Sequence, residues 1–265
     1  MQPPRILAVL SFAIAAFATA CSTAPQIDAR RDAAFHALAP TGKLRVGVYT
    51  GSPTSYVPGE GGKPARGIAY ELGALLAKDA GVPYEPVIFP SNEKVFEAFR
   101  AGALDVVFTN ATAARAQFID FTPAVLEVEK GYLVPPRSQA KDGTDVDRAG
   151  VRVGVSRAST TETELGKILA NATMVPMPSL AEGAHAVADG RIDAYASNKA
   201  ILFEMSDGLP GSRVVGNWGT EAFAFGIPKG RQAALAYLAA FVEQERRRGS
   251  VRAAAERAGV RGLKK

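Results

Sequence analysis

Residues 102–121, GALDVVFTNATAARAQFIDF, contain the features that decide the fold. The apolar run from Leu104 to Phe108 predicts a buried strand. Small polar residues follow directly, among them Asn110 and Thr112, and Arg115 comes a few residues later. Small ligands bind at the carboxyl ends of strands in open α/β sheets, and arginine presents a planar fork of donors that suits a carboxylate. The stretch therefore predicts a strand that ends at a carboxylate site. A surface cation at a helix start is the alternative for Arg115.

Predicted strands and helices alternate on both sides of this stretch. The first half of the chain predicts strands over 44–49, 82–89 and 104–108, with helices over 68–80 and 92–101. The second half predicts strands over 151–155, 173–176 and 192–196, with helices over 161–169 and from Ser179 to about Gly190. Further helices are expected over 199–205, 233–244 and 251–258. This order is typical of mostly parallel sheets with right-handed crossovers.

Two short patterns occur once in each half. Val151-Arg-Val-Gly-Val155 repeats the pattern of Leu44-Arg-Val-Gly-Val48, and Gly190-Arg-Ile-Asp193 resembles Gly102-Ala-Leu-Asp105. The repetition predicts two half-domains of one design, although the periodicity alone is equally consistent with one large doubly wound sheet.

The N-terminus has the composition of a secretory signal. Arg5 precedes an almost wholly apolar run, 6–20, which is short for a transmembrane helix and ends in small residues. Ala18-Thr19-Ala20-Cys21 resembles a lipobox, in which the cysteine is acylated; plain secretory cleavage nearby is the alternative. We therefore predict a signal peptide over 1–20, a lipidated Cys21 and a tether over 21–41. Cys21 is the only cysteine, so no internal disulfide is expected.

Several classes of function are disfavoured by composition. The net charge is +5, and the basic runs Arg246–Arg248 and Lys264–Lys265 lack the interleaved aromatics of a nucleic-acid surface. The two histidines, His36 and His185, have no neighbouring Cys, Asp or Glu at metal spacing, so neither a metal site nor a Ser-His-Asp triad is expected. The glycines form neither a G-x-G-x-x-G motif nor a P-loop, so we expect no cofactor.

Two motifs resemble those of the family-3 periplasmic solute-binding proteins, the amino-acid receptors of ABC importers. The first is Asn110-Ala-Thr112-Ala-Ala-Arg115 followed by Ile119-Asp120-Phe121-Thr122, and the second is the run from Val153 to Glu162. The resemblance covers roughly residues 42–262. It implies an α/β periplasmic-binding-protein type II fold, in which two lobes, each with a mostly parallel sheet flanked by helices, are joined by two crossing segments. Lobe one is expected over 42–128 and 223–265, and lobe two over 129–222.

The resemblance also implies a ligand site between the lobes. Arg115, Asn110 and Thr112 would bind a carboxylate from lobe one, while Ser159 and Thr160 would face it from a helix N-terminus, where backbone N–H groups attract anions. Ordinary N-capping is the alternative for these two hydroxyls. We expect Tyr49 and Tyr56 to form a wall on which a ligand stacks.

Asn198 departs from the family's pattern. Many of the family's amino-acid receptors have an aspartate at this position that holds the ligand's α-ammonium, whereas this chain has a neutral amide after the strand over 192–196. A charge-assisted hydrogen bond is roughly twice as strong as a neutral one. With no facing carboxylate, the site is expected to be net positive and to disfavour zwitterionic α-amino acids. A plain N-cap of the next helix is the alternative for Asn198.

The resemblance implies a monomeric binding protein at the extracytoplasmic face, anchored by lipid through Cys21. It would trap a small carboxylate-bearing solute, an amino acid or a related organic acid, and present it to an ABC permease. The alternative is an enzyme similar to cyclohexadienyl dehydratase, and a sensory or scaffold lipoprotein is a third possibility. The enzyme needs a general acid in the cleft, and Glu162, inside a helix start, is the only acidic residue expected there. We therefore predict a binding protein and not an enzyme.

Overall fold

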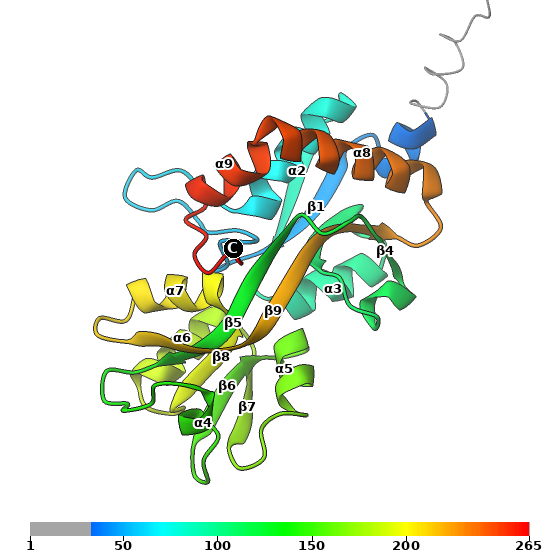
Figure 1. The fold of residues 1–265 in the computed structure, drawn as a ribbon. Helices are drawn as coiled ribbons and strands as arrows, with labels where there is room; N and C mark the ends of the chain where they lie inside the picture. The colour runs from blue at the N-terminus through cyan, green and yellow to red at the C-terminus, as the bar shows by residue number, and fades with distance from the viewer. Residues whose placement is uncertain (1–32, 265) are drawn as a thin grey trace, which may run out of the picture.

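The chain folds into two lobes that share two long strands (Figure 1). The structure is a computed structural model and describes residues 33–264. Within that range one nine-stranded sheet runs through both lobes in the order β2-β1-β3-β9-β5-β8-β6-β7, with β4 paired to β9. No helix in the described part of the chain is long and apolar enough to span a membrane.

Lobe one is built on parallel strands. Strand β1 (Leu44–Tyr49) lies between β2 (Tyr84–Phe89) and β3 (Val106–Asn110) and pairs with both in parallel. The short strand β4 (Ile119–Phe121) pairs with β9. The helices of this lobe are α2 (Ile68–Ala80), α3 (Asn92–Arg100), α8 (Gln232–Arg248) and α9 (Ser250–Arg257).

Lobe two repeats the arrangement. Strand β6 (Arg152–Ser156) pairs in parallel with β7 (Thr173–Met177) and β8 (Ala194–Asn198). Its helices are α4 (Gly143–Val146), α5 (Thr160–Leu165), α6 (Leu180–Ala188) and α7 (Lys199–Asp207).

Two antiparallel strands join the lobes. Strand β5 (Leu126–Val134) and the long strand β9 (Arg213–Pro228) pair with each other along most of β5. At one end β9 pairs with β3 of lobe one, and at the other β5 pairs with β8 of lobe two. The carboxyl ends of β3 and β8 therefore meet where the chain crosses between the lobes, which confirms the predicted fold class.

The repeated sequence patterns form the same ion pair in each lobe. The Asp105 carboxylate accepts hydrogen bonds from the Arg45 backbone N–H (3.0 Å), Nε (2.9 Å) and Nη2 (2.8 Å). The Asp193 carboxylate accepts the equivalent three from Arg152, at 3.0, 2.9 and 3.0 Å. Each pair ties the first strand of a lobe to the segment that leads into its third strand.

Local differences from the sequence predictions cluster at element ends. The strand predicted over 104–108 runs over 106–110, because Asp105 faces Arg45 before the strand begins. The helix predicted over 161–169 ends at Leu165, where Gly166 is the C-cap. Helix α2 has the predicted bounds, and Gly81 ends it with a φ of 69°, which glycine adopts without strain.

The described part of the predicted tether is docked on lobe one. Residues 33–38 are helical, and the Leu38 side chain, only 1 % exposed, belongs to the core that also contains Leu44 and Leu72. The tether as predicted over 21–41 is therefore too long at its C-terminal end, because apolar side chains among its last residues are buried. The expected signal peptide and Cys21 lie outside the described residues.

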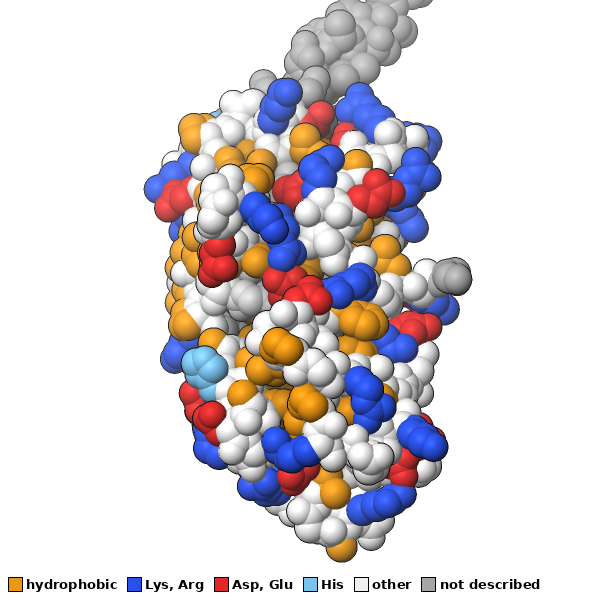
Figure 2. All heavy atoms as spheres, turned by 90° about the vertical axis from the view of Figure 1, so that its left-hand side faces the viewer, with side chains coloured by type: hydrophobic (Ala, Val, Ile, Leu, Met, Phe, Trp, Pro, Cys, Tyr) orange, Lys and Arg blue, Asp and Glu red, His pale blue; other side chains and the backbone are white. Residues whose placement is uncertain are grey.

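Charged side chains of both signs are interspersed over the two lobes on the face drawn in Figure 2. Charged side chains also connect the lobes. Arg66, in the loop before α2, pairs with Glu204 of α7 at 2.6 Å, and Arg261 of the C-terminal segment donates from Nη1 to Asp207 at 3.0 Å. The described lobes therefore contact each other beyond the crossing strands.

Candidate functional site

Arg115 is buried at the end of β3 and is not a surface cation. It begins a short 3₁₀ helix (Arg115–Gln117), and only 8 % of the residue is exposed. Its Nη1 donates to Thr109 Oγ1 (2.7 Å), to the Asn110 carbonyl (3.2 Å) and to Asn110 Oδ1. The guanidinium carbon lies 4.3 Å from the centre of the Phe96 ring. Among residues 33–264, no acidic side chain forms an ion pair with Arg115, so its charge is buried without a direct counterion.

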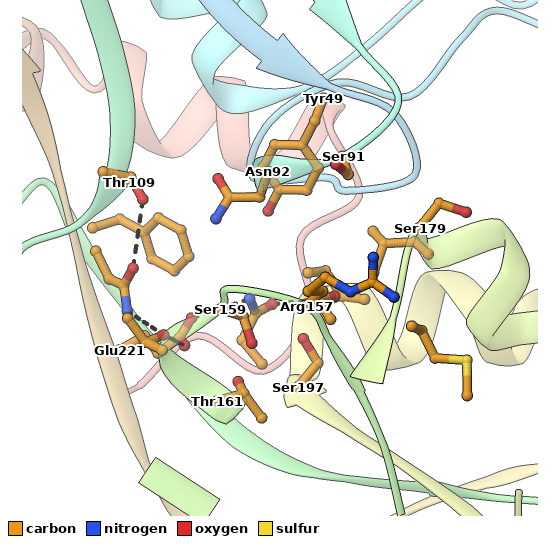
Figure 3. A pocket seen from close by; sticks show the side chains of 18 of the residues that line it. Tyr49, Ser91, Asn92, Thr109, Arg157, Ser159, Thr161, Ser179, Ser197 and Glu221 are labelled. Atoms are coloured by element: carbon orange, nitrogen blue, oxygen red, sulfur yellow. Dashed lines mark hydrogen bonds between the residues drawn. The ribbon is translucent and has the colours of Figure 1, made fainter. Parts of the chain in front are cut away.

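A small cavity between the lobes adjoins Arg115, and most of the predicted site residues line it (Figure 3). Its volume is about 40 Å³, which holds water but not a solute such as an amino acid. The predicted residues in its lining come from both lobes: Tyr49, Asn110, Arg115, Ser159, Thr160 and Asn198. The lobes must therefore separate for a larger solute to enter.

Two predicted residues lie elsewhere. Thr112 Oγ1 accepts from the Arg115 backbone N–H at 3.3 Å and lines a groove of about 620 Å³, which shares Arg115, Ser159 and Thr160 with the cavity. Tyr56 is outside the cavity lining, and its ring packs edge-on against Tyr70, with centroids 5.3 Å apart. Thr112 thus shapes the turn that carries Arg115, while Tyr56 packs against the core of lobe one.

The two hydroxyls at the start of α5 have different partners. Ser159 is the N-cap, and its Oγ accepts from the Glu162 backbone N–H at 3.1 Å, as the capping alternative requires. Thr160 Oγ1 instead accepts from Asn110 Nδ2 at 2.8 Å and donates to Glu221 Oε1 at 2.9 Å. The Asn110–Thr160 hydrogen bond joins lobe one to lobe two across the cavity.

Glu221 is the main functional candidate that sequence reasoning missed. It lies in β9, it is 6 % exposed, and its Oε2 accepts from Asn198 Nδ2 at 3.2 Å. The expectation that Glu162 is the only acid in the cleft is wrong, because the Glu162 carboxylate accepts from the Ala158 backbone N–H at 2.6 Å and does not line the cavity. One sequence signal could have indicated Glu221: it is an acidic residue directly before the apolar run 222–225, where the chain was expected to return from lobe two to lobe one.

Asn198 acts both as a cap and as a site residue. Its Oδ1 accepts from the Ile201 backbone N–H at 3.2 Å, which caps α7, while its Nδ2 is turned to Glu221. The expectation of a site without a facing carboxylate is therefore wrong. Asn198 lacks a charge, but it orients a carboxylate that has one.

Burial disfavours the charged forms of Arg115 and Glu221, the two buried charged residues of the cavity lining. It lowers the pKa of Arg115 to about 10, although Glu221 and Tyr49 act in the opposite direction, and Arg115 remains protonated at neutral pH. Burial also raises the pKa of the Glu221 carboxyl, against the lowering effects of the Thr160 hydrogen bond and of Lys130 and Arg115. A ligand with charges of both signs would supply the counterions that these groups lack.

No arrangement for a metal accompanies these groups. Within the part of the chain that the structure describes, no three His, Cys, Asp or Glu side chains are grouped so that they could hold a metal ion. The described lining offers one buried cation, one buried carboxylate and several hydroxyl and amide groups.

Several solved structures have a similar fold. An ancestral amino-acid-binding protein, AncCDT-1, a precursor of cyclohexadienyl dehydratase, has a TM-score of 0.74 and 23 % identity, covering 84 % of this chain and 97 % of its own. A mutant of ArgBP from T. maritima has a TM-score of 0.76 and 17 % identity, with coverages of 85 % and 99 %.

A third similar structure comes from Streptococcus pneumoniae. It is an amino acid ABC transporter substrate-binding protein bound to L-arginine, with a TM-score of 0.73, 20 % identity and coverages of 86 % and 99 %. No curated protein matches the sequence. At these identities the structural likeness establishes the fold alone.

Family membership comes from the sequence match. The family model described as bacterial extracellular solute-binding proteins, family 3, matches residues 44–259, which include both lobes and both crossing strands. The chain therefore belongs to the bacterial extracellular solute-binding proteins of family 3.

Proposed function

We propose that this protein captures a small carboxylate-bearing solute, an amino acid or a related organic acid, between its lobes and delivers it to the permease of an ABC importer. The observation that carries the proposal is the buried Arg115 guanidinium, which lines the cavity and has no ion-pair partner among the described residues. All its hydrogen bonds to other described residues run through Nη1, so Nε and Nη2 remain for a ligand carboxylate.

The two-lobed fold supports capture by hinge closure. Lobes joined by two strands can open and close as rigid bodies around a ligand. Here Asn110 of lobe one and Thr160 of lobe two are already hydrogen-bonded at the site, so the structure corresponds to a closed arrangement. A solute that replaces this contact would bridge the same two lobes.

A thermal-shift screen over amino acids, dicarboxylates and other small organic acids tests the proposal. A ligand present at 100 times its Kd stabilises the native state by about 2.7 kcal/mol, which is readily detected as a higher Tm. At least one carboxylate-bearing compound is expected to raise the Tm, while its amide analogue, which cannot form the ion pair, is expected to have a much smaller effect. A screen in which no such compound changes the Tm would contradict the proposal.

Glu221 keeps an enzymatic alternative open on the same scaffold. A buried carboxyl with a raised pKa is the kind of group that serves as a general acid, and one structural relative is a precursor of cyclohexadienyl dehydratase. Binding is favoured because the structural relatives described above are binding proteins. Incubation with prephenate, followed by ultraviolet absorbance, separates the two functions, since only the enzyme forms product.

We also propose that Cys21 is lipidated and anchors the protein, as a monomer, at the extracytoplasmic face of a membrane. Replacing Cys21 with serine removes the only thiol that could be acylated, so the variant is expected to move from the membrane fraction to the soluble extracytoplasmic fraction. Fractionation and immunoblotting of parent and variant provide the measurement. Equal membrane partitioning of the two proteins would argue against the anchor.

A further inference from the structure

The charged groups that line the cavity do not balance. The described part of the lining contains three residues with acidic or basic side chains: Arg115, Arg157 and Glu221. The nearby Lys130 does not change this sum, because it forms an ion pair with Glu164. With Glu221 ionised, the lining is net positive by one charge and contains both signs. A complementary ligand has two negative groups and one positive group.

The Glu221 carboxylate is arranged to accept a hydrogen bond from a cationic group. Each of its oxygens accepts one hydrogen bond from a neutral donor, Thr160 Oγ1 or Asn198 Nδ2. An ionised carboxylate has about four lone-pair positions, so acceptor capacity remains on the cavity side. Asn198 cannot supply this counter-charge, because it is a neutral amide whose Oδ1 already accepts from the Ile201 backbone N–H and whose Nδ2 is a donor.

The Arg157 guanidinium is free to donate hydrogen bonds to an anionic group. Arg157 follows the end of β6 and is exposed to solvent, and its guanidinium, which lines the cavity, has no hydrogen-bond or ion-pair partner among residues 33–264. In Figure 3 the Arg157 side chain extends towards Ser179, on the side of the cavity away from Glu221. It is therefore placed to contact a different part of a ligand from the part that Glu221 contacts.

We propose that the site selects an acidic amino acid, with one carboxylate on Arg115, the ammonium on Glu221 and the second carboxylate on Arg157. The inference rests on the proposed function and adds the class of solute. It assigns the preference for a second carboxylate to Arg157, and it assigns to Glu221 the ammonium recognition that Asn198 cannot provide.

Calorimetric titration of the purified protein with matched ligands tests this assignment. L-Glutamine and glutarate each differ from L-glutamate by one charged group, the side-chain carboxylate and the ammonium respectively. L-Aspartate, L-asparagine and succinate form a second, shorter series. In one of the two series, the parent is expected to bind the acidic amino acid with a Kd about tenfold or more lower than the Kd of either analogue. The reason is that each analogue lacks one charged group, and a hydrogen bond to a charged group is stronger than one to a neutral group.

Two variants separate the roles. Arg157→Gln is expected to bind the acidic amino acid and its amide with nearly equal Kd values. It should still bind the acidic amino acid more tightly than the diacid. Glu221→Gln is expected to remove the preference for the amino acid over the diacid. Arg148→Gln, which removes an exposed lobe-two cation outside the cavity lining, serves as the control and should retain both ratios.

The outcomes distinguish this inference from the proposed function. Tighter binding of L-glutamine or L-arginine than of either acidic amino acid, with loss of that binding in an Arg115 variant, would overturn the acidic assignment and leave the proposed function in place. Unchanged ratios in Arg157→Gln would also overturn it. Failure of every amino acid and organic acid to bind would overturn both.

Discussion

Replacing Arg115 with alanine is expected to weaken binding of the carboxylate ligand by about 2–5 kcal/mol, the usual loss when one partner of a buried charge pair is removed. That range corresponds to a Kd increase of roughly thirtyfold to several thousandfold. The physical reason is that the ligand carboxylate would remain buried between the lobes without a cation, since Arg115 is the buried guanidinium of the described lining. Isothermal titration calorimetry with the ligand found by thermal shift provides the measurement.

The matched controls for Arg115 concern charge and geometry. Arg115→Lys keeps the positive charge but loses the planar fork, so its affinity should fall between those of the parent and the alanine variant. The amide analogue of the ligand should bind parent and alanine variant with similar, weak affinity, because it has no carboxylate to lose. Equal affinity of Arg115→Ala and parent for the carboxylate ligand would remove Arg115 from the site.

Replacing Asp105 with alanine is expected to lower the free energy of unfolding by about 3–5 kcal/mol, because the Arg45 side chain, which is only 17 % exposed, would lose the carboxylate that it pairs with. The Asp105 side chain is fully buried, and Arg231 Nη1 also lies 3.7 Å from it. Urea unfolding followed by circular dichroism measures the change, and an unaltered m-value would show that native and unfolded states are otherwise comparable.

Asp193 is the natural control for this prediction. It makes the same three hydrogen bonds to Arg152 in lobe two, but the Arg152 side chain is 43 % exposed, so water can solvate it once its partner is removed. Asp193→Ala is therefore expected to cost only about 1–2 kcal/mol. Equal losses for the two substitutions would show that burial does not distinguish the two pairs.

Local patterns were sufficient for much of the fold. Helix α2 was predicted with its observed bounds because apolar spacing marks its buried face and Gly81 supplies the left-handed C-cap. The helix predicted to begin at Ser179 does so, and the Ser179 Oγ caps α6 by accepting from the Glu182 backbone N–H at 3.1 Å. The repeated Arg-Val-Gly-Val and Asp patterns indicated two equivalent half-domains, and each half forms the same strand order and the same ion pair.

The site was predictable where it depends on strand ends. Asn110 and Asn198 close β3 and β8, one strand in each lobe, and ligands bind at the carboxyl ends of strands in open α/β sheets. Glu221 was not predictable in the same way. It belongs to neither terminus of a strand, and it faces Thr160 and Asn198 only because β9 crosses beside them.

The sequence by itself determined the parallel strands of each lobe and most of the helices, the two-fold repetition and the cation that follows β3, because these depend on periodicity, capping and short-range spacing. It predicted neither β4 nor the strand character of β5 and β9, which is set by pairing between distant segments. Only the tertiary structure decided which side chains share the cavity. It brought Glu221 and Arg157 into the lining and left Tyr56 on Tyr70. The reason is that the electrostatic character of the site is a sum over residues from both lobes, and their distances are set by how β5 and β9 pair.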